Sequence, residues 1–595
     1  MDPRPDDPTT IAPVPDTAPA AVPDVANGAA SERVITQPVE VAAAGTGGSR
    51  TRWLVGGGIA VAAVAAIALA ASFLAASPLP EALKYLPADS AIVVELRPEL
   101  PGDQRQHLGN FLAHFPGFED QSTLDGKLDE VLERITREAS RGAVDYATRV
   151  KPLLAGPMAL SVTADALDDA MTGGTPGGVL FVATTDGSAT CDSIFGSTSP
   201  GTTHRGVEIR VIGLDGACAL HERYLLVGTA PSVQAGLDAR LDSTGVDGSS
   251  TYKAARSKLE GDQLASVFVD GDPLIAVVQD AAGPFGGAAE FPEGFWVIQG
   301  LRVTDDALIV DAYTAAVTPT LPSGAPTSAP ASESRFATSL PVDTLGYVEF
   351  HGVGASVERA LAALEAQPAT AEVLAGLDDA LLAFGGTDNL TGWIEEAGIA
   401  VLPTDDAVGG AILLRGTDAA TAAARLAQVR NLLVLGSIGS DITVTDTDLD
   451  GVTITTVDLG DISSLLGAAG IPGADIPGAG GETRLELAFA VRDDLVVIGV
   501  GAGTVERILD TEAGASLATS ATYGRVIEVA GSRNDLQVFI ALDATLALVE
   551  RFLPADQIGM WNTEFKPYLD HLAGVAMTTI NSSSGAHFRG VLTVK

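Results

Sequence analysis

The stretch Leu86-Pro-Ala-Asp-Ser-Ala-Ile-Val-Val-Glu95 recurs later in the chain as Leu340-Pro-Val-Asp-Thr-Leu-Gly-Tyr-Val-Glu349. In both places a proline-containing turn runs into a segment that is typical of a β-strand. Further similar pairs follow in the same order: residues 177–186 with 409–418, 206–209 with 451–454, 224–228 with 495–499, 251–252 with 522–523, and 267–268 with 538–539. Each match is weak alone, but their shared order predicts two copies of one unit.

A segment rich in Pro, Ser and Ala separates the two similar regions. Residues 318–335 have the composition of an extended linker, so the two copies are expected at 83–317 and 336–595. Either copy is long enough to bury a core of its own. The sequence therefore predicts two tandem, similar domains.

The expected fold class of each copy is α+β, with a mainly antiparallel sheet and packed helices. Short Gly/Asp turns separate strand-like segments such as 452–458 and 495–498, and such turns favour antiparallel hairpins. Leu124, Leu128 and Leu132 recur at helical spacing after Ser122, which is suited to cap a helix. Strict alternation of strands and helices is absent, so a doubly wound sheet is the alternative.

The N-terminal region predicts a tail followed by a membrane span. Residues 1–52 are rich in Pro and Ala and have the composition of a disordered arm. Residues 53–76 carry no charge, and as a helix they would extend about 36 Å, enough for a hydrocarbon layer of about 30 Å. Arg50 and Arg52 precede the span, which favours a cytoplasmic N-terminus and extracytoplasmic C-terminal domains. A cleaved signal peptide is the alternative.

The charge balance and the cysteine count exclude several classes of partner and site. The 595 residues include 76 Asp and Glu but 35 Lys and Arg, giving a formal net charge of −41. Nucleic-acid binding needs a cationic surface, so nucleic acid is not an expected partner. Two cysteines are too few for a Cys-rich zinc site or a disulfide-dense scaffold.

The two cysteines, Cys191 and Cys218, both lie in the first copy. Outside the membrane they are candidates for a disulfide that would close a loop of about 27 residues. Two buried free thiols are the alternative.

One segment imitates a calcium loop. Asp446, Asp448 and Asp450 stand at positions 1, 3 and 5, with Gly451 at position 6, as in the first half of such a loop. Val457 stands where the bidentate carboxylate is needed, so these residues are weak metal candidates. An Asp/Gly hairpin turn is the favoured interpretation.

Other patterns predict no catalytic or cofactor site. The run Gly499-Val-Gly501-Ala-Gly503 lacks the full dinucleotide-binding spacing, so a strand–helix turn is expected. His107 and His114 are seven residues apart and suggest a helix face rather than a metal pair. Glu95 and Glu349 occupy matching strand positions in separate copies, where polar strand ends are the simplest interpretation. We expect no cofactor.

Residues 85–105 (YLPADSAIVVELRPELPGDQR), with His114-Phe-Pro-Gly-Phe118 and the segment 124–130, resemble an uncharacterised bacterial family, domain of unknown function 3352. The resemblance implies a short cytoplasmic tail, one membrane span and a large exterior region. It supplies no catalytic residue, because the family has no known activity.

The expected function is that of a single-pass membrane-anchored exterior protein, a non-enzymatic interaction or scaffold module of the bacterial cell envelope. Its partners would be the lipid bilayer, through the single helix, and an envelope protein. The alternative is a binding protein for a small apolar or lipid-like ligand held between helices and sheet, suggested by the Ala/Leu/Gly-rich segments 354–384 and 461–480. An enzyme without a recognisable motif is the least favoured hypothesis.

Overall fold

The computed structural model describes most of the chain beyond residue 79. The described ranges are 80–172, 178–274, 294–315, 331–365, 391–404, 408–438, 442–461, 484–582 and 585–595. The expected tail (1–52) and span (53–76), most of the linker, and, of the Ala/Leu/Gly-rich segments, residues 366–384 and 462–480 lie outside these ranges. Within them, no helix is both long and apolar enough to cross a bilayer. The membrane anchor therefore stays a prediction.

The first half of the described chain (residues 80–315) contributes ten strands to one sheet. They are β1 (Ser90–Leu96), β2 (Met158–Thr163), β3 (Val179–Thr184), β4 (Ser199–His204), β5 (Val207–Ile212), β6 (Gly216–His221), β7 (Tyr224–Thr229), β8 (Ala265–Asp270), β9 (Trp296–Val303) and β10 (Ala307–Thr314). Their hydrogen-bonded neighbours give the spatial order β4-β5-β6-β7-β3-β2-β1-β8-β9-β10.

The second half (residues 331–595) contributes ten further strands in the corresponding order. They are β12 (Gly346–His351), β13 (Ile394–Pro403), β14 (Val408–Gly416), β15 (Thr443–Leu449), β16 (Val452–Asp461), β17 (Arg484–Arg492), β18 (Leu495–Val500), β20 (Leu536–Ala541), β21 (Leu572–Ser582) and β22 (Gly585–Val594). Their spatial order is β15-β16-β17-β18-β14-β13-β12-β20-β21-β22. A separate short pair joins β11 (Ser332–Glu333) to β19 (Arg533–Asn534).

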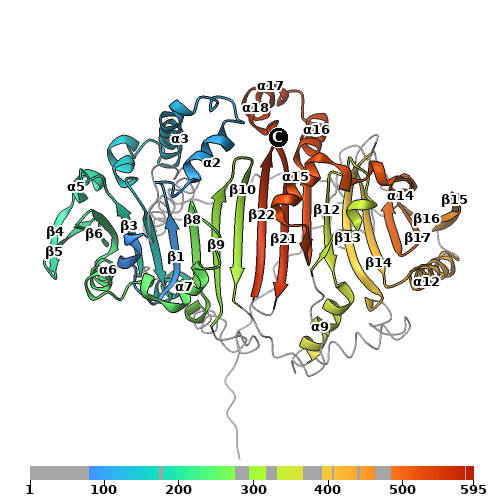
Figure 1. Ribbon diagram of the computed structural model, residues 1–595, viewed down its shortest axis with the longest axis horizontal. Coiled ribbons are helices and arrows are strands. Elements are labelled where there is room, and N and C mark those ends of the chain that lie inside the picture. Colours follow the sequence, from blue (N-terminus) through green and yellow to red (C-terminus); the bar gives the residue numbers. More distant parts are fainter. Residues whose placement is uncertain are drawn as a thin grey trace, which may run out of the picture. The chain divides into compact units, whose positions relative to one another are not determined.

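The last strands of the two halves pair with each other. β10 and β22 run antiparallel from Ala307↔Thr593 to Tyr313↔His587, so the twenty strands form one sheet (Figure 1). Every strand pair within the described ranges is antiparallel, and this confirms the α+β class with a mainly antiparallel sheet. A doubly wound sheet, which needs parallel strands, does not describe these pairs.

Helices lie between the strands along the chain in both halves. In the first half they are α2 (Gln104–Leu112), α3 (Leu124–Ala139), α4 (Ala164–Thr172), α5 (Cys191–Phe195), α6 (Ala230–Asp242) and α7 (Ser250–Arg256). In the second half they are α9 (Val353–Glu365), α12 (Ala419–Ser437), α14 (Ala502–Leu509), α15 (Ala521–Ala530), α16 (Leu542–Phe552), α17 (Ile558–Met560) and α18 (Lys566–Leu569). The expected amphipathic helix is present as α3, but the expected cap is wrong. Thr123 is the N-cap of α3, and Ser122 instead donates its backbone N–H to Asp120.

The two halves repeat local details as well as strand order. Ser249 caps α7 by accepting a hydrogen bond from the Tyr252 backbone, and Ser520 caps α15 in the same way through Tyr523. Both tyrosines are buried against the sheet. Such caps satisfy backbone N–H groups at the helix start, so both helices present an aromatic ring to the core in the same manner.

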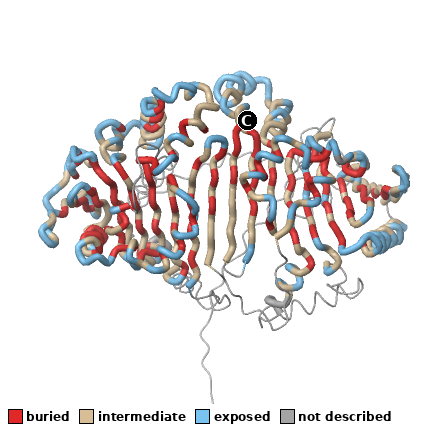
Figure 2. The backbone as a smooth tube through the Cα atoms, in the orientation of Figure 1, coloured by how far each residue is buried: buried red, intermediate tan, exposed pale blue. Residues whose placement is uncertain are grey.

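Side chains on one face of β12 to β14 are mostly buried, and those on the other face, which α12 also contacts, are more exposed. Along β12 to β14, buried positions alternate with intermediate or exposed ones (Figure 2). This period of two is expected for strands with one face against a core. The buried face carries the polar residues described next.

Candidate functional site

A group of buried polar side chains lies beneath α15 in the second half. Glu349 on β12 and Gln537 on β20 are cross-strand partners, and both are fully buried. The Gln537 amide donates to the hydroxyl of Tyr523 at 3.1 Å and to that of Tyr347. The two tyrosine hydroxyls are 3.1 Å apart. The Gln537 amide and the two tyrosine hydroxyls therefore satisfy one another across three elements, as burial requires.

His351 lies between two carboxylates at one end of this network. Its Nε2 is 3.3 Å from Oε1 of Glu349, and its Nδ1 is 3.6 Å from Oε1 of Glu396 on β13. Nδ1 is also 2.9 Å from the hydroxyl of Ser332, and the other oxygen of Glu349 accepts a hydrogen bond from Ser334. Glu349, His351 and Glu396 are 0%, 8% and 6% exposed. We call these three residues the acid–histidine cluster.

Register explains why the three residues meet. Glu349 and His351 are two residues apart on one strand, so both point to the buried face of the sheet. The β12–β13 register sets His351 directly opposite Glu396. The cluster is therefore assembled by strand pairing rather than by proximity in sequence.

Two arginines flank the cluster, and other carboxylates share them. Arg415 Nε lies 3.9 Å from Glu396, while its Nη1 donates to Asp494 at 2.6 Å. Arg335 also binds Asp494, and it lies 3.7 Å from Glu395 and 4.0 Å from Glu396. Both guanidinium groups are therefore engaged mainly by residues outside the cluster.

Burial and neighbouring charges shift the pKa values of Glu349 and His351. Burial raises the pKa of Glu349, and the hydrogen bond from Ser334 only partly opposes that effect. Burial lowers the pKa of His351, but hydrogen bonding to Glu396 and the charge of Glu349 outweigh it, so the net shift is upward. With no metal bound, the protonated imidazole is thus favoured by its acidic neighbours.

The corresponding position in the first half holds a different arrangement. Glu95 on β1 matches Glu349, and Arg97 matches His351. Arg97 Nε donates to Glu99 at 2.7 Å, and its Nη1 lies 3.6 Å from Glu95. All three side chains are buried. The first half therefore supplies a permanent cation where the second half has an imidazole.

A pocket opens onto the acid–histidine cluster. It has a volume of about 310 Å³, and its lining includes Ser332, His351, Gly354, Glu395 and Glu396. A small solute therefore has a route to two of the three residues in the cluster.

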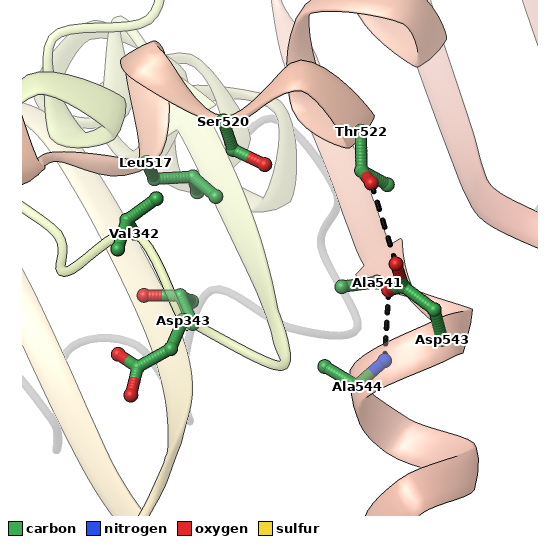
Figure 3. Close-up of a pocket in the computed structure, with 9 residues that line it drawn as sticks. Val342, Asp343, Leu517, Ser520, Thr522, Ala541, Asp543 and Ala544 are labelled. Carbon is green, nitrogen blue, oxygen red and sulfur yellow. Dashed lines mark hydrogen bonds between the residues drawn. The ribbon is translucent and has the colours of Figure 1, made fainter.

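A second pocket, of about 360 Å³, lies where the Leu340–Glu349 repeat begins. Asp343 and Asp543 stand on its opposite walls (Figure 3). Asp543 accepts a hydrogen bond from the Ala544 backbone at 2.7 Å, and Arg507 binds Asp343 at 2.7 Å. The two carboxylates therefore already have partners, and they do not converge on one point in the pocket.

The opposite face of the sheet carries an exposed apolar patch. Phe350, Ile399 and Ile412 are 41%, 54% and 46% exposed, and Val401 and Val408 are exposed beside them. Ile399 and Ile412 are direct cross-strand partners on β13 and β14. We call these five residues the apolar patch.

An apolar pocket of about 230 Å³ lies between α12 and the sheet. Leu426 and Leu433 of α12 line one side, and Leu414, Phe489 and Ile498 of β14, β17 and β18 line the other. Among the lining residues, Arg425 carries the one charged side chain. The surroundings suit an apolar solute.

The weak metal candidates lie in a hairpin. Leu449 and Val452 are the last paired residues of β15 and β16, so Asp450 and Gly451 form a two-residue turn with φ of 50° and 85°. Asp446 is bound by Arg430 and by the Thr455 hydroxyl, and Asp448 accepts from the Gly451 backbone. The structure therefore gives all three residues the roles expected of a turn and its flanks.

The other residues singled out from the sequence have structural roles. Cys191 and Cys218 form a disulfide with Cα atoms 6.0 Å apart. Gly501 has a φ of 78° and is the N-cap of α14, so the glycine run forms a strand–helix turn. His107 on α2 lies between Asp103 and Asp305 at the surface, and His114 lies 3.5 Å from Asp306.

Comparison with known proteins adds a family and no function. A family model described as "Protein of unknown function (DUF3352)" matches residues 53–593. No curated protein matches the chain. A crystal structure of TP0453 (crystal form I) is similar over 42% of this chain and 82% of that chain, with 8% identity and a TM-score of 0.21. A likeness at that score carries no argument about fold or function.

Proposed function

The chain belongs to the family of proteins of unknown function DUF3352, and on that premise we propose that it is a single-pass membrane-anchored exterior protein of the bacterial cell envelope that acts as a non-enzymatic interaction module. The uncharged run 53–76 after Arg50 and Arg52 supports the anchor and its orientation. The matching strand orders of the two halves support an origin from two tandem copies of one domain.

The apolar patch is the observation that carries this proposal. Soluble proteins rarely leave several large apolar side chains exposed side by side, and such patches are typical of interaction sites. Here Phe350, Ile399 and Ile412 come from three adjacent strands, so they form one surface rather than scattered contacts. A protein partner that covered the patch would remove this surface from water.

Affinity capture with the full chain in detergent-free nanodiscs tests the proposal. We expect envelope extract to yield a stoichiometric protein partner, and we expect the double variant Ile399→Glu with Ile412→Glu to lose it. Leu214→Glu, at an exposed turn residue of the first half, is the matched control and should retain the partner. Equal capture by the patch variant and the wild type would contradict this assignment of the surface.

The apolar pocket beneath α12 favours a second candidate, binding of a small apolar or lipid-like ligand. Its lining is apolar on the helix side and the sheet side alike, and such surroundings reward burial of an apolar molecule at about 25 cal/mol per Å².

Fluorescence titration of the full chain with N-phenyl-1-naphthylamine tests this candidate. Leu426→Trp should fill the pocket and abolish the signal, while Leu435→Trp, at an exposed position of the same helix, should not. A signal that both variants retain would place the probe elsewhere and refute the pocket.

A further inference from the structure

We propose that the acid–histidine cluster is a binding site for a divalent transition-metal cation, with Zn²⁺ the best-matched ion. Imidazole nitrogen and carboxylate oxygen are established ligand types for this ion. The proposal is independent of the proposed function, because the apolar patch lies on the opposite face of the sheet.

The ligand atoms are already gathered. One ligand atom from each of Glu349, His351 and Glu396 lies within 4.8 Å of the other two, and no other group of three such residues in the described ranges meets this criterion. Zinc binds such ligands at about 2.0 to 2.2 Å. Small side-chain adjustments would therefore bring the three onto one ion, leaving an open position toward the pocket beside His351 and Glu396.

Buried polar atoms in the cluster lack hydrogen-bond partners. Oε1 of Glu349, Nε2 of His351 and Oε2 of Glu396 form no hydrogen bond with any described residue. Each belongs to a residue that is more than nine-tenths buried. Nε2 of His351 and Oε1 of Glu349 lie 3.3 Å apart as an ion pair that does not complete a hydrogen bond, so a cation between them would give both atoms a partner.

The Nδ1 atom of His351 is hydrogen-bonded, which orients the ring and leaves Nε2 for a metal. Nδ1 of His351 lies 2.9 Å from the Ser332 hydroxyl, whereas Nε2 faces Glu349. Hydrogen bonding at one ring nitrogen fixes the tautomer and ring orientation, and it leaves the other nitrogen available to a metal. Nε2 is thus the expected ligand atom.

The surrounding charge favours a cation. Five carboxylates lie in and around the cluster: Glu349, Glu395, Glu396, Asp494 and Asp535. Two guanidinium groups, of Arg335 and Arg415, oppose them. A neutral imidazole leaves an excess of three negative charges, and a divalent cation would offset most of it. Protonation of His351 would offset less.

In the first half, the position that corresponds to His351 is filled by a permanent cation, Arg97. Arg97 donates its backbone N–H to the Leu264 carbonyl, and His351 donates its own to Asp535, at the matching place beside the eighth strand of each half. The guanidinium of Arg97 occupies the space between Glu95 and Glu99. His351→Arg should therefore place a permanent cation beside Glu349, as Arg97 lies beside Glu95, while excluding the metal.

Zinc retention by the full chain in nanodiscs tests the site. The chain is first stripped with a chelator, then loaded with Zn²⁺ and dialysed against excess Mg²⁺, which displaces weak surface binding. We expect stoichiometric zinc in the wild type and in His107→Asn, which disrupts an exposed His–Asp group. In His351→Arg and in Glu349→Gln, we expect affinity to fall by about 100-fold or more.

Two results would overturn the proposal. One is a wild-type chain without stoichiometric zinc, which would make the cluster a protonated histidine bridging two carboxylates. The other is zinc retained unchanged by His351→Arg. Cobalt(II) absorption of the wild type provides a readout that needs no variant. A tetrahedral spectrum with nitrogen and oxygen ligands supports the site, and an octahedral aquo spectrum refutes it.

Discussion

Asp311 and Arg589 face each other across the strand pair that joins the two halves of the sheet. They are direct register partners on β10 and β22, and Arg589 Nε donates to Oδ1 of Asp311 at 2.6 Å. His587 Nε2 lies 2.9 Å from the same oxygen, and Arg302 Nε lies 3.4 Å from the other. Asp311 is almost completely buried. One carboxylate therefore gathers three basic groups at the junction.

We expect Asp311→Asn to destabilise the junction by about 3 kcal/mol, because removing one partner of a buried ion pair leaves the other charges uncompensated. Urea denaturation followed by tryptophan fluorescence measures the change. Asp556→Asn, at an exposed carboxylate, is the control and should shift the midpoint little. An equal shift in both variants would mean that Asp311 has no special role in joining the halves.

The same carboxylate predicts a dependence of stability on pH. Burial raises the pKa of Asp311, but hydrogen bonds from His587 and Arg589 outweigh burial and bring the pKa to about 2. A carboxyl whose folded pKa lies below its unfolded value stabilises the folded state above the unfolded pKa and loses that contribution as pH falls.

The free-energy difference between wild type and Asp311→Asn should therefore be constant above about pH 5 and shrink by about 2 kcal/mol toward pH 2. Urea midpoints of both proteins measured through this range provide the test. A difference that stayed constant down to pH 2 would contradict a depressed pKa.

The disulfide provides a third prediction. Cys191 begins α5 and Cys218 lies on β6, 27 residues later in sequence. Cys191→Ala with Cys218→Ala should cost about 3 kcal/mol, because the unfolded chain regains the entropy of an open loop. Wild type with reductant should lose as much stability, and the double variant should not respond to reductant. A reductant effect on the double variant would show that the loss has another source.

The sequence repeat made parts of the cluster predictable. Glu349 matches Glu95, so the comparison of the copies placed it on a strand, but the interpretation of both residues as polar strand ends was wrong, because both are fully buried. His351 lies two residues further on the same strand face, and the period of two would have placed it beside Glu349. Glu396 could not be found this way, because its position depends on the register between β12 and β13. Register is set by packing and turn geometry rather than by local composition.

The junction of the halves was also beyond sequence reasoning. An edge strand presents unpaired backbone groups that any strand can satisfy, so the pairing of β10 with β22 has no signature in either segment. Composition and turns did predict the α+β class. The cap of α3 was misassigned because Ser122 and Thr123 are equally suited by residue type, and the short helical turn at Gln121–Thr123 decides between them.

Arg97 provides the last prediction, because it is the buried cation that His351 replaces in the second half. Arg97→Met leaves Glu95 and Glu99 buried without their cation and should cost about 3 to 5 kcal/mol. Arg105→Met, which breaks an exposed pair with Asp125, should cost at most about 1 kcal/mol. Adding Glu99→Gln to Arg97→Met should recover part of the loss, since one buried charge is then removed. Equal urea midpoints for the Arg97 and Arg105 variants would show that the buried carboxylates do not depend on Arg97.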